Sequence, residues 1–167
     1  MKITIERARK SDAEALIEFL RTVGGQSDNL SFGKEGIDIS IEAEGDFLSD
    51  IETSSDAIML LAKSDGRIVG NASLFRGSRR MSHRGELSLC VLKEYQNNGI
   101  GKRLVEALIE FARENSFDII DLQVRCDNAS AIHLYERYGF EKVGTHPSFF
   151  KIDGKDIPFC FMCLKLN

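Results

Sequence analysis

The residues best suited to chemistry lie in one glycine-containing loop near the middle of the chain, Gln96-Asn97-Asn98-Gly99-Ile100-Gly101-Lys102. An apolar run at 86–92 precedes the loop, and apolar residues at helical spacing follow it, at Leu104, Leu108 and Phe111. We therefore expect a strand, a loop and a helix in this order. Free backbone N–H groups and the positive end of the helix dipole would meet in the loop, and its glycines permit close approach. This arrangement favours a site for a pyrophosphate that needs no metal ion.

Two nucleotide-binding motifs do not fit this loop. The nucleotide P-loop, G-x-x-x-x-G-K-[ST], would place its first glycine at Gln96 and its magnesium-binding hydroxyl at Arg103. The dinucleotide-binding motif requires a third small residue, and Leu104 occupies that position. Two alternatives remain, a metal-free pyrophosphate site and a tight strand-to-helix turn that binds nothing.

Two longer segments resemble the signatures of the GNAT acetyltransferase superfamily. The first is LCVLKEYQNNGIGKRLVEALIEFA, in which [QR]-x-x-G-x-[GA] follows a strand and precedes a helix. The second is VRCDNASAIHLYERYGF, which is similar to the family pattern V-x-x-x-N-x-x-A-I-x-L-Y-E-x-x-G-F. The resemblance implies an α/β (α+β) fold with a mixed, mostly antiparallel central sheet of about seven strands. It also implies a parallel β-α-β step, a V-shaped splay between two strands and helices on both faces of the sheet.

The resemblance further implies acetyl-coenzyme A (acetyl-CoA) as the cosubstrate. Matched to the family pattern, the loop residues expected to bind its pyrophosphate are Gln96, Asn97, Asn98, Gly99, Ile100, Gly101 and Lys102. The main chain of Leu89, Cys90 and Val91 is expected to pair with the pantetheine arm. Asn128, Ala131 and Tyr135 match family positions that contact the cofactor from the opposite side.

Two side chains are expected to transfer protons in the acetyl transfer from acetyl-CoA to an amine that the resemblance implies. Tyr135 matches the family tyrosine that protonates the departing thiolate; the alternative is a core aromatic on a short helix. An amine that titrates near about 10.4 must lose a proton before it attacks. Glu86 is the candidate base, directly or through water, and a solvated strand end is the alternative. The ribosomal-protein N-terminal acetyltransferases have their base where this chain has Gln123, which cannot serve as one.

The resemblance implies an N-acetyltransferase that moves the acetyl group of acetyl-CoA to a primary amine by direct attack in a ternary complex. A polyamine, an amino acid, another small amine and a protein N-terminus remain open as acceptors. The closing hairpin resembles that of the spermidine acetyltransferase branch, and the acceptor loops are expected at 24–40 and 145–157. An acyl-CoA-binding sensor or scaffold without transfer activity is the alternative function.

An acidic segment at 42–56 has two interpretations. Its carboxylates either steer a cationic acceptor or form a solvated acidic helix. The residues concerned are Glu42, Glu44, Asp46, Asp50, Glu52 and Asp56.

The elements that must position these residues follow from the hydrophobic pattern. Helices are expected from a Ser11–Glu14 capping box to Gly24-Gly25, and then at 40–51, 100–115 and, capped by Asn128, up to Gly139. Strands are expected at 2–8, 57–63, 67–76, 86–92, 117–125, 140–144 and 149–166, the last of these turning at Asp153-Gly154.

The composition describes an ordinary globular chain. At 167 residues, with 43% hydrophobic and 29% charged residues, a single domain over 1–167 is expected. No run approaches the ~20 apolar residues of a membrane span, and the N-terminus lacks the apolar core of a signal peptide, so a cytoplasmic protein is expected. The net charge of −4 argues against a nucleic-acid-binding surface.

The cysteines and histidines predict no metal site. Without an export signal, the four cysteines are expected to be reduced thiols. Cys160 and Cys163 form a C-x-x-C spacing, but on a strand they point to opposite faces. The three histidines lack ligand spacing. A homodimer is a further expectation, since the closing hairpin is apolar.

Overall fold

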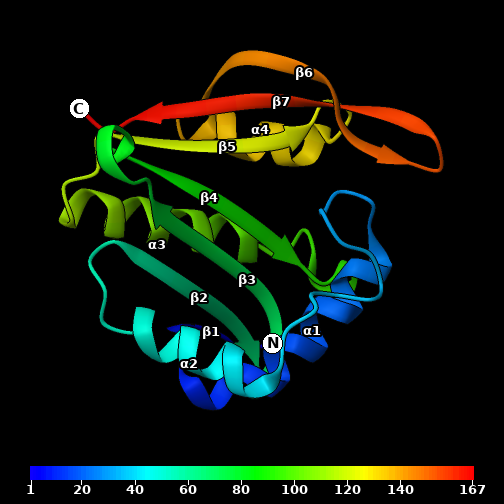
Figure 1. The fold of residues 1–167 in the computed structure, drawn as a ribbon, viewed down its shortest axis with the longest axis vertical. Helices are drawn as coiled ribbons and strands as arrows, with labels where there is room; N and C mark the ends of the chain where they lie inside the picture. Colours follow the sequence, from blue (N-terminus) through cyan, green and yellow to red (C-terminus); the bar gives the residue numbers. More distant parts are fainter.

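The computed structural model describes residues 1–167 and has one seven-stranded sheet in the order β1-β2-β3-β4-β5-β7-β6 (Figure 1). The strands are β1 (Ile3–Arg7), β2 (Ala57–Ser64), β3 (Arg67–Arg76), β4 (Arg84–Val91), β5 (Ile119–Arg125), β6 (Glu141–Ile152) and β7 (Lys155–Lys165). The helices are α1 (Ala13–Gln26), α2 (Ile41–Ile51), α3 (Ile100–Glu114) and α4 (Ala129–Arg137). Only β4 and β5 run parallel, and this confirms the expected mixed sheet with one parallel step.

Helices cover both faces of the sheet, as expected. A Cβ on Gly70 of β3 would touch Ile100 and Leu104 of α3, whereas Phe75, which points to the other face of β3, packs on Phe47 of α2. Figure 1 shows α3 and α4 behind the sheet and α2 in front of it. The side chains of α3 that face the sheet are fully buried, so this helix is fixed against β2, β3 and β4. No helix is both long and apolar enough to cross a membrane.

Two helix caps and one hairpin turn form where the sequence predicts them, because each depends only on residues close together in the chain. Ser40 caps α2, its hydroxyl accepting the N–H of Ala43 at 3.0 Å, and Asn128 caps α4 in the same way. The β2–β3 hairpin turns through Asp65 and Gly66, which both have positive φ (48° and 83°). This geometry explains the Asp-Gly pair, because a tight hairpin turn of this kind requires left-handed residues.

The start and end of α1 differ from the prediction. A short 3₁₀ turn, Lys10–Asp12, precedes the helix, and the Asp12 carboxylate accepts the N–H of Arg9 at 2.8 Å. The expected Ser11–Glu14 capping box is therefore wrong. The helix also continues through its two glycines to Gln26, since neither glycine has the positive φ that ends a helix. Gly24 instead permits the close approach of the following loop. A Cβ on Gly24 would lie 2.1 Å from the carbonyl oxygen of Gly33.

The closing hairpin also differs from the prediction. The expected interruption between 144 and 149 is absent, and β6 is one strand of 12 residues. Its register against β7 shifts instead, because His146 pairs with Phe159 but Phe150 pairs with Ile157. Four steps along β6 therefore match two along β7, which makes the segment a bulge within a continuous strand.

The V-shaped splay of the sheet lies between β4 and β5. β4 pairs with β3 from Gly85 to Val91, but with β5 only from Arg84 to Glu86. Beyond Glu86 the two parallel strands diverge, as Figure 1 shows. The backbone edge of β4 that would face β5 is thus free of strand partners over its last residues, and it becomes available to a ligand.

Candidate active site

A groove of about 700 Å³ lies at the open end of this splay. It is bounded by the end of β4, the loop after it, the end of β5, α4, and the end of α1 with its following loop. The predicted site residues that line it are Leu89, Cys90, Val91, Gln96, Asn97, Gly99, Ile100, Gly101, Lys102, Asn128, Ala131 and Tyr135. Two predicted residues, Asn98 and Glu86, do not line it.

The loop before α3 is held open by its own side chains. Gln96 Nε2 donates to the carbonyl of Val91 at 3.1 Å, and Asn98 Nδ2 donates to the carbonyls of Tyr95 and Gln96 at 3.2 and 3.1 Å. Asn97 and Gly99 both have positive φ, 61° and 78°. Asn98 therefore fixes the shape of the loop from outside the groove.

The N-terminus of α3 presents free donors to the groove. Gly99 is the N-cap residue and makes no side-chain cap. The N–H groups of Gly101 and Lys102, in the first turn, have no acceptor within the helix. They lie where the helix dipole is positive, so the site suits an anion.

The charged side chains that line the groove also favour an anion, as do the free N–H groups of α3. Although the whole chain has a formal charge of −4, the groove contains no aspartate or glutamate. Its basic side chains are Lys102, Arg125 and Arg137. An elongated polyanion is therefore favoured here over a cation.

Tyr135 on α4 is 6% exposed and packs on Phe140, with ring centroids 5.6 Å apart. Its hydroxyl makes no side-chain hydrogen bond. It is nevertheless not among the fully enclosed polar atoms that lack a partner, since the only such side-chain atom is Arg7 Nε. The hydroxyl oxygen is therefore accessible from the groove that Tyr135 lines. The pKa of Tyr135 is raised well above its usual range, mainly by burial and also by electrostatic coupling to the neighbouring Cys90. The phenol thus keeps its proton at neutral pH.

The two cysteines nearest the groove are not activated. Burial raises the pKa of Cys90 to about 12, so its thiol stays protonated. Cys126 lies beside Cys160, with the two sulfur atoms 3.0 Å apart, and this contact raises the pKa of Cys126. Neither thiol has the environment of a nucleophile. Cys160 is buried while Cys163 is only half-buried, consistent with opposite faces of β7.

Glu86 lies at the closed end of the splay. It is exposed and sits four residues before Cys90, roughly 13 Å along the strand at about 3.3 Å per residue. Its partner on β5 is Asp121, whose carboxylate forms an ion pair with Arg84. Only a chain of water molecules or a long acceptor would connect Glu86 to the mouth of the groove.

Arg125 is a groove residue that the sequence reasoning missed. Its guanidinium binds both oxygens of Asp127, at 2.9 and 2.8 Å, and Nη1 donates to the carbonyl of Asp28 at 3.4 Å. It therefore ties the loop after α1 to the end of β5. In the sequence only the R-x-D spacing indicates the pairing of Arg125 with Asp127. The contact with Asp28 spans 97 positions, so no local pattern predicts it.

The acidic segment around α2 is partly neutralised. Asp46, Glu52 and Asp56 pair with Lys10, Arg9 and Arg76, at 3.2, 3.8 and 2.8 Å respectively. Glu44 is only 4% exposed and points inward from the helix. Few of these carboxylates are left to attract a cation.

Comparison with known proteins agrees with this geometry. The sequence matches the Acetyltransferase (GNAT) family over residues 29–140. The chain belongs to the GNAT acetyltransferase family. A solved acetyltransferase of the GNAT family from Streptococcus pneumoniae superposes with a TM-score of 0.95 at 32% identity, over 98% of this chain and 99% of that one.

Two curated GNAT relatives match over part of their length. The N-alpha-acetyltransferase RimI of Mycobacterium tuberculosis is 36% identical over 57% of this chain and 59% of its own length. The L-amino acid N-acetyltransferase AaaT of Escherichia coli is 34% identical over 62% of this chain and 65% of its own length. The matched region thus spans less than two thirds of either relative.

Acetyl-CoA is the acetyl donor of GNAT enzymes, and the residues of the groove fit it. A solved Salmonella typhimurium yncA with its cofactor acetyl-CoA has the same fold, with a TM-score of 0.85 at 21% identity. In the present structure the free N–H groups of Gly101 and Lys102 suit a pyrophosphate, and the free edge of β4 suits the amides of a pantetheine arm. The basic lining of the groove suits the remaining negative charge.

Proposed function

We propose that the protein is an N-acetyltransferase that moves the acetyl group of acetyl-CoA to a primary amine by direct attack in a ternary complex. The observation that carries this proposal is the groove at the splay of β4 and β5. It combines free helix N-terminal donors, basic side chains without any carboxylate, and a buried tyrosine whose hydroxyl is accessible. Family membership supports the same reaction.

In this proposal the chain positions the thioester in two ways. The N–H groups at the start of α3 hold the pyrophosphate, and Lys102 and Arg137 add positive charge beside it. The free backbone edge of β4 at Leu89–Val91 holds the pantetheine arm as an additional strand would. The thioester then lies deep in the splay, where Tyr135 lines the groove.

Tyr135 acts as the general acid. The neutral amine nitrogen forms a bond to the carbonyl carbon, the carbon–sulfur bond breaks, and the sulfur takes the phenolic proton as the thiol leaves. The proton that the nitrogen then releases on forming the amide restores the phenol. The raised pKa of Tyr135 keeps this proton available throughout the neutral range. The nearby Cys90 stays protonated and does not compete as a nucleophile.

The attacking amine loses its proton toward Glu86. Because Glu86 is exposed and outside the groove lining, we assign it the terminal position of a water-mediated route. Gln123, which lines the groove, is able to orient such water by hydrogen bonding but cannot take up the proton.

The test is release of free thiol from acetyl-CoA in the presence of a panel of primary amines, together with the mass of the acetylated product. Matched formation of thiol and acetylated amine supports the proposal. Binding of acetyl-CoA without turnover on any amine would instead identify an acyl-CoA-binding sensor.

A further inference from the structure

A second cavity of about 410 Å³ adjoins the groove. It lies between the loop after α1, at 27–33, and the tip of the β6–β7 hairpin, at 149–152. Ser27 and Leu30 line both cavities, so the two share a wall. A molecule seated in the second cavity therefore lies beside the groove in which we place the thioester.

The bulge in β6 determines the lining of this second cavity. In a regular strand Phe149 and Phe150 would point to opposite faces, but both rings contact Phe159 and both line the cavity. The shift of register between His146 and Phe150 produces this arrangement. Ser148 holds the bulge, because its hydroxyl donates to the Asp156 carboxylate at 2.6 Å and its N–H donates to His146 Nδ1 at 3.1 Å.

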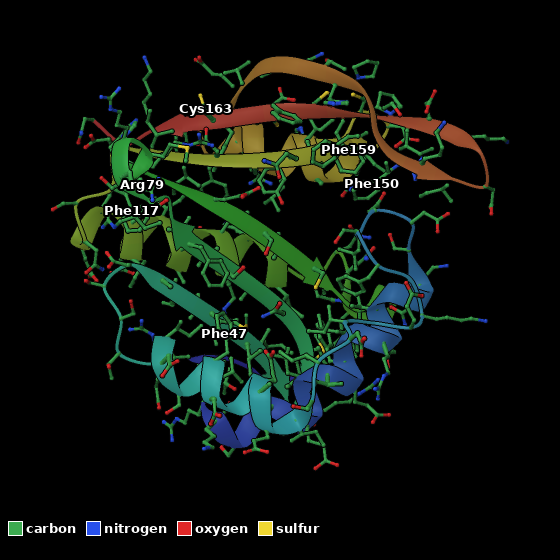
Figure 2. All side chains as sticks on the ribbon, viewed as in Figure 1. Phe47, Arg79, Phe117, Phe150, Phe159 and Cys163 are labelled. Atoms are coloured by element: carbon green, nitrogen blue, oxygen red, sulfur yellow. The ribbon has the colours of Figure 1, made fainter.

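Phe159 supports both aromatic side chains from behind. Its ring centroid lies 4.3 Å from that of Phe150 and 4.9 Å from that of Phe149, and the residue is 3% exposed. Figure 2 shows Phe150 and Phe159 on the side of the hairpin that faces the loop after α1. The wall is therefore preformed, although Phe149 itself is still 38% exposed. Preformed apolar walls bind an apolar group without the cost of ordering side chains.

The opposite wall of the second cavity is also apolar and anchored. It contains Leu30 and Phe32, both half-buried. Arg125 holds this loop through the carbonyl of Asp28, while Phe159 of the facing hairpin pairs with Arg125 on β5. One residue at the end of β5 thus fixes both walls relative to the groove.

The charges in the second cavity do not suit a polycation. Its ionisable side chains are Asp28 and Lys151, which carry opposite charges, and Lys151 pairs with Asp156 at 3.4 Å. A polyamine would meet a single carboxylate and a repelling ammonium group. An apolar group meets five apolar side chains instead, Leu30, Phe32, Phe149, Phe150 and Ile152.

We infer that the acceptor is a primary amine that carries an apolar group of about aromatic size, and that Phe149 and Phe32 select it from the second cavity. This inference depends on the proposed transfer of acetyl to an amine. The cavity volume is ample for one aromatic side chain, and its position beside the groove leaves the amino group to reach the thioester. One apolar contact of this kind is worth roughly tenfold to a hundredfold in kcat/KM.

The experiment compares thiol release with 2-phenylethylamine and isopentylamine against ethylamine, putrescine and spermidine. We expect kcat/KM to be at least tenfold higher for the two amines with large apolar groups. Phe149→Ala and Phe32→Ala should each abolish most of this preference while leaving the rate with ethylamine nearly unchanged. Val143→Ala removes an apolar side chain that is 65% exposed on the same β6 strand, and it serves as the matched control.

Three results separate the inference from the proposed function. Highest kcat/KM for putrescine or spermidine overturns the apolar acceptor while transfer to an amine stands. A preference for apolar amines that survives both phenylalanine substitutions overturns the assignment to this cavity. Absence of thiol release with every amine, despite an acetyl-CoA-induced rise in melting temperature, overturns the proposed function and the inference with it.

Discussion

Glu86 on β4 is paired with Asp121 on β5, and this is the last pair that the two parallel strands make. The ion pair between Arg84 and Asp121 closes this end of the splay. Every later residue of β4, up to Val91, keeps its partner on β3 only. The groove therefore begins where this pairing ends, and its position follows from the register of the sheet.

Gly99 provides the most local test of the loop. Its φ of 78° disfavours any side chain, and a Cβ there would meet nothing within 4 Å, so Gly99→Ala introduces backbone strain without a clash. Left-handed backbone costs an L-residue about 1–2 kcal/mol. We expect acetyl-CoA to bind roughly five- to thirtyfold more weakly, as measured by calorimetry.

Gly144→Ala is the matched control for Gly99→Ala. A Cβ at Gly144 also meets open space, but this residue on β6 has no positive φ. It should leave the affinity for acetyl-CoA unchanged. Equal effects of the two substitutions would argue against a special role for the loop conformation.

Lys102 tests the electrostatic part of the account. Its ammonium group is half exposed and lies 4.0 Å from Glu106, so its charge is not strongly engaged elsewhere. Lys102→Met should weaken acetyl-CoA binding about two- to fivefold at low salt, and the difference should shrink as salt screens the charge. Lys155→Met at the hairpin turn is the control with the same change of charge. A loss that does not depend on ionic strength would contradict an electrostatic role.

Glu86→Gln tests the proposed proton route. At lower pH a larger fraction of the amine is protonated, so loss of the base should matter more there. We expect the ratio of wild-type to variant kcat/KM to grow as the pH falls from 9 toward 7. Glu141→Gln, an exposed change on β6, should leave the profile unaltered. A variant with the wild-type pH profile would remove Glu86 from the route.

The sequence predicts the parts of this site that depend on neighbouring residues. The loop before α3 follows from the Gly-x-Gly spacing, and the caps at Ser40 and Asn128 act within three residues. The bulge that aims Phe149 and Phe150 depends instead on the register with β7 and on Ser148 bonding to Asp156. No local pattern carries that information.

Contacts between distant segments explain the other differences. Gly24 of α1 permits the close approach of the loop at Gly33 and does not end the helix. Arg125 acquires its tethering role through Asp28, and Cys126 meets Cys160 across two strands. These last two pairs are separated by 97 and 34 positions, so spacing in the sequence could not reveal them.

Glu44 gives a prediction for stability rather than activity. Burial raises the pKa of this carboxyl above its usual value. The folded state therefore binds a proton more tightly than the unfolded state does. The contribution of Glu44 to stability falls as the pH rises from the carboxyl pKa of the unfolded state to the raised pKa of the folded state. Glu44→Gln should raise the melting temperature at pH 7, and the difference should narrow as the pH falls below the usual carboxyl pKa.

Glu42→Gln on the same helix is the control for Glu44→Gln. Glu42 is exposed and should show little change at either pH. If Glu44→Gln lowered the melting temperature at pH 7, the carboxylate would have a stabilising partner that the structure does not contain.

Tyr135→Phe measures the central claim most directly, with thiol release and acetylated product followed beside the affinity for acetyl-CoA. A general acid is worth about 10²–10⁴-fold in rate, and removing only the hydroxyl leaves the ring packed on Phe140. Tyr138→Phe is the control, since that hydroxyl donates to Glu106 at 2.7 Å outside the groove. The account predicts that turnover falls by at least a hundredfold in Tyr135→Phe alone, with acetyl-CoA affinity nearly unchanged. Wild-type turnover in Tyr135→Phe would contradict it.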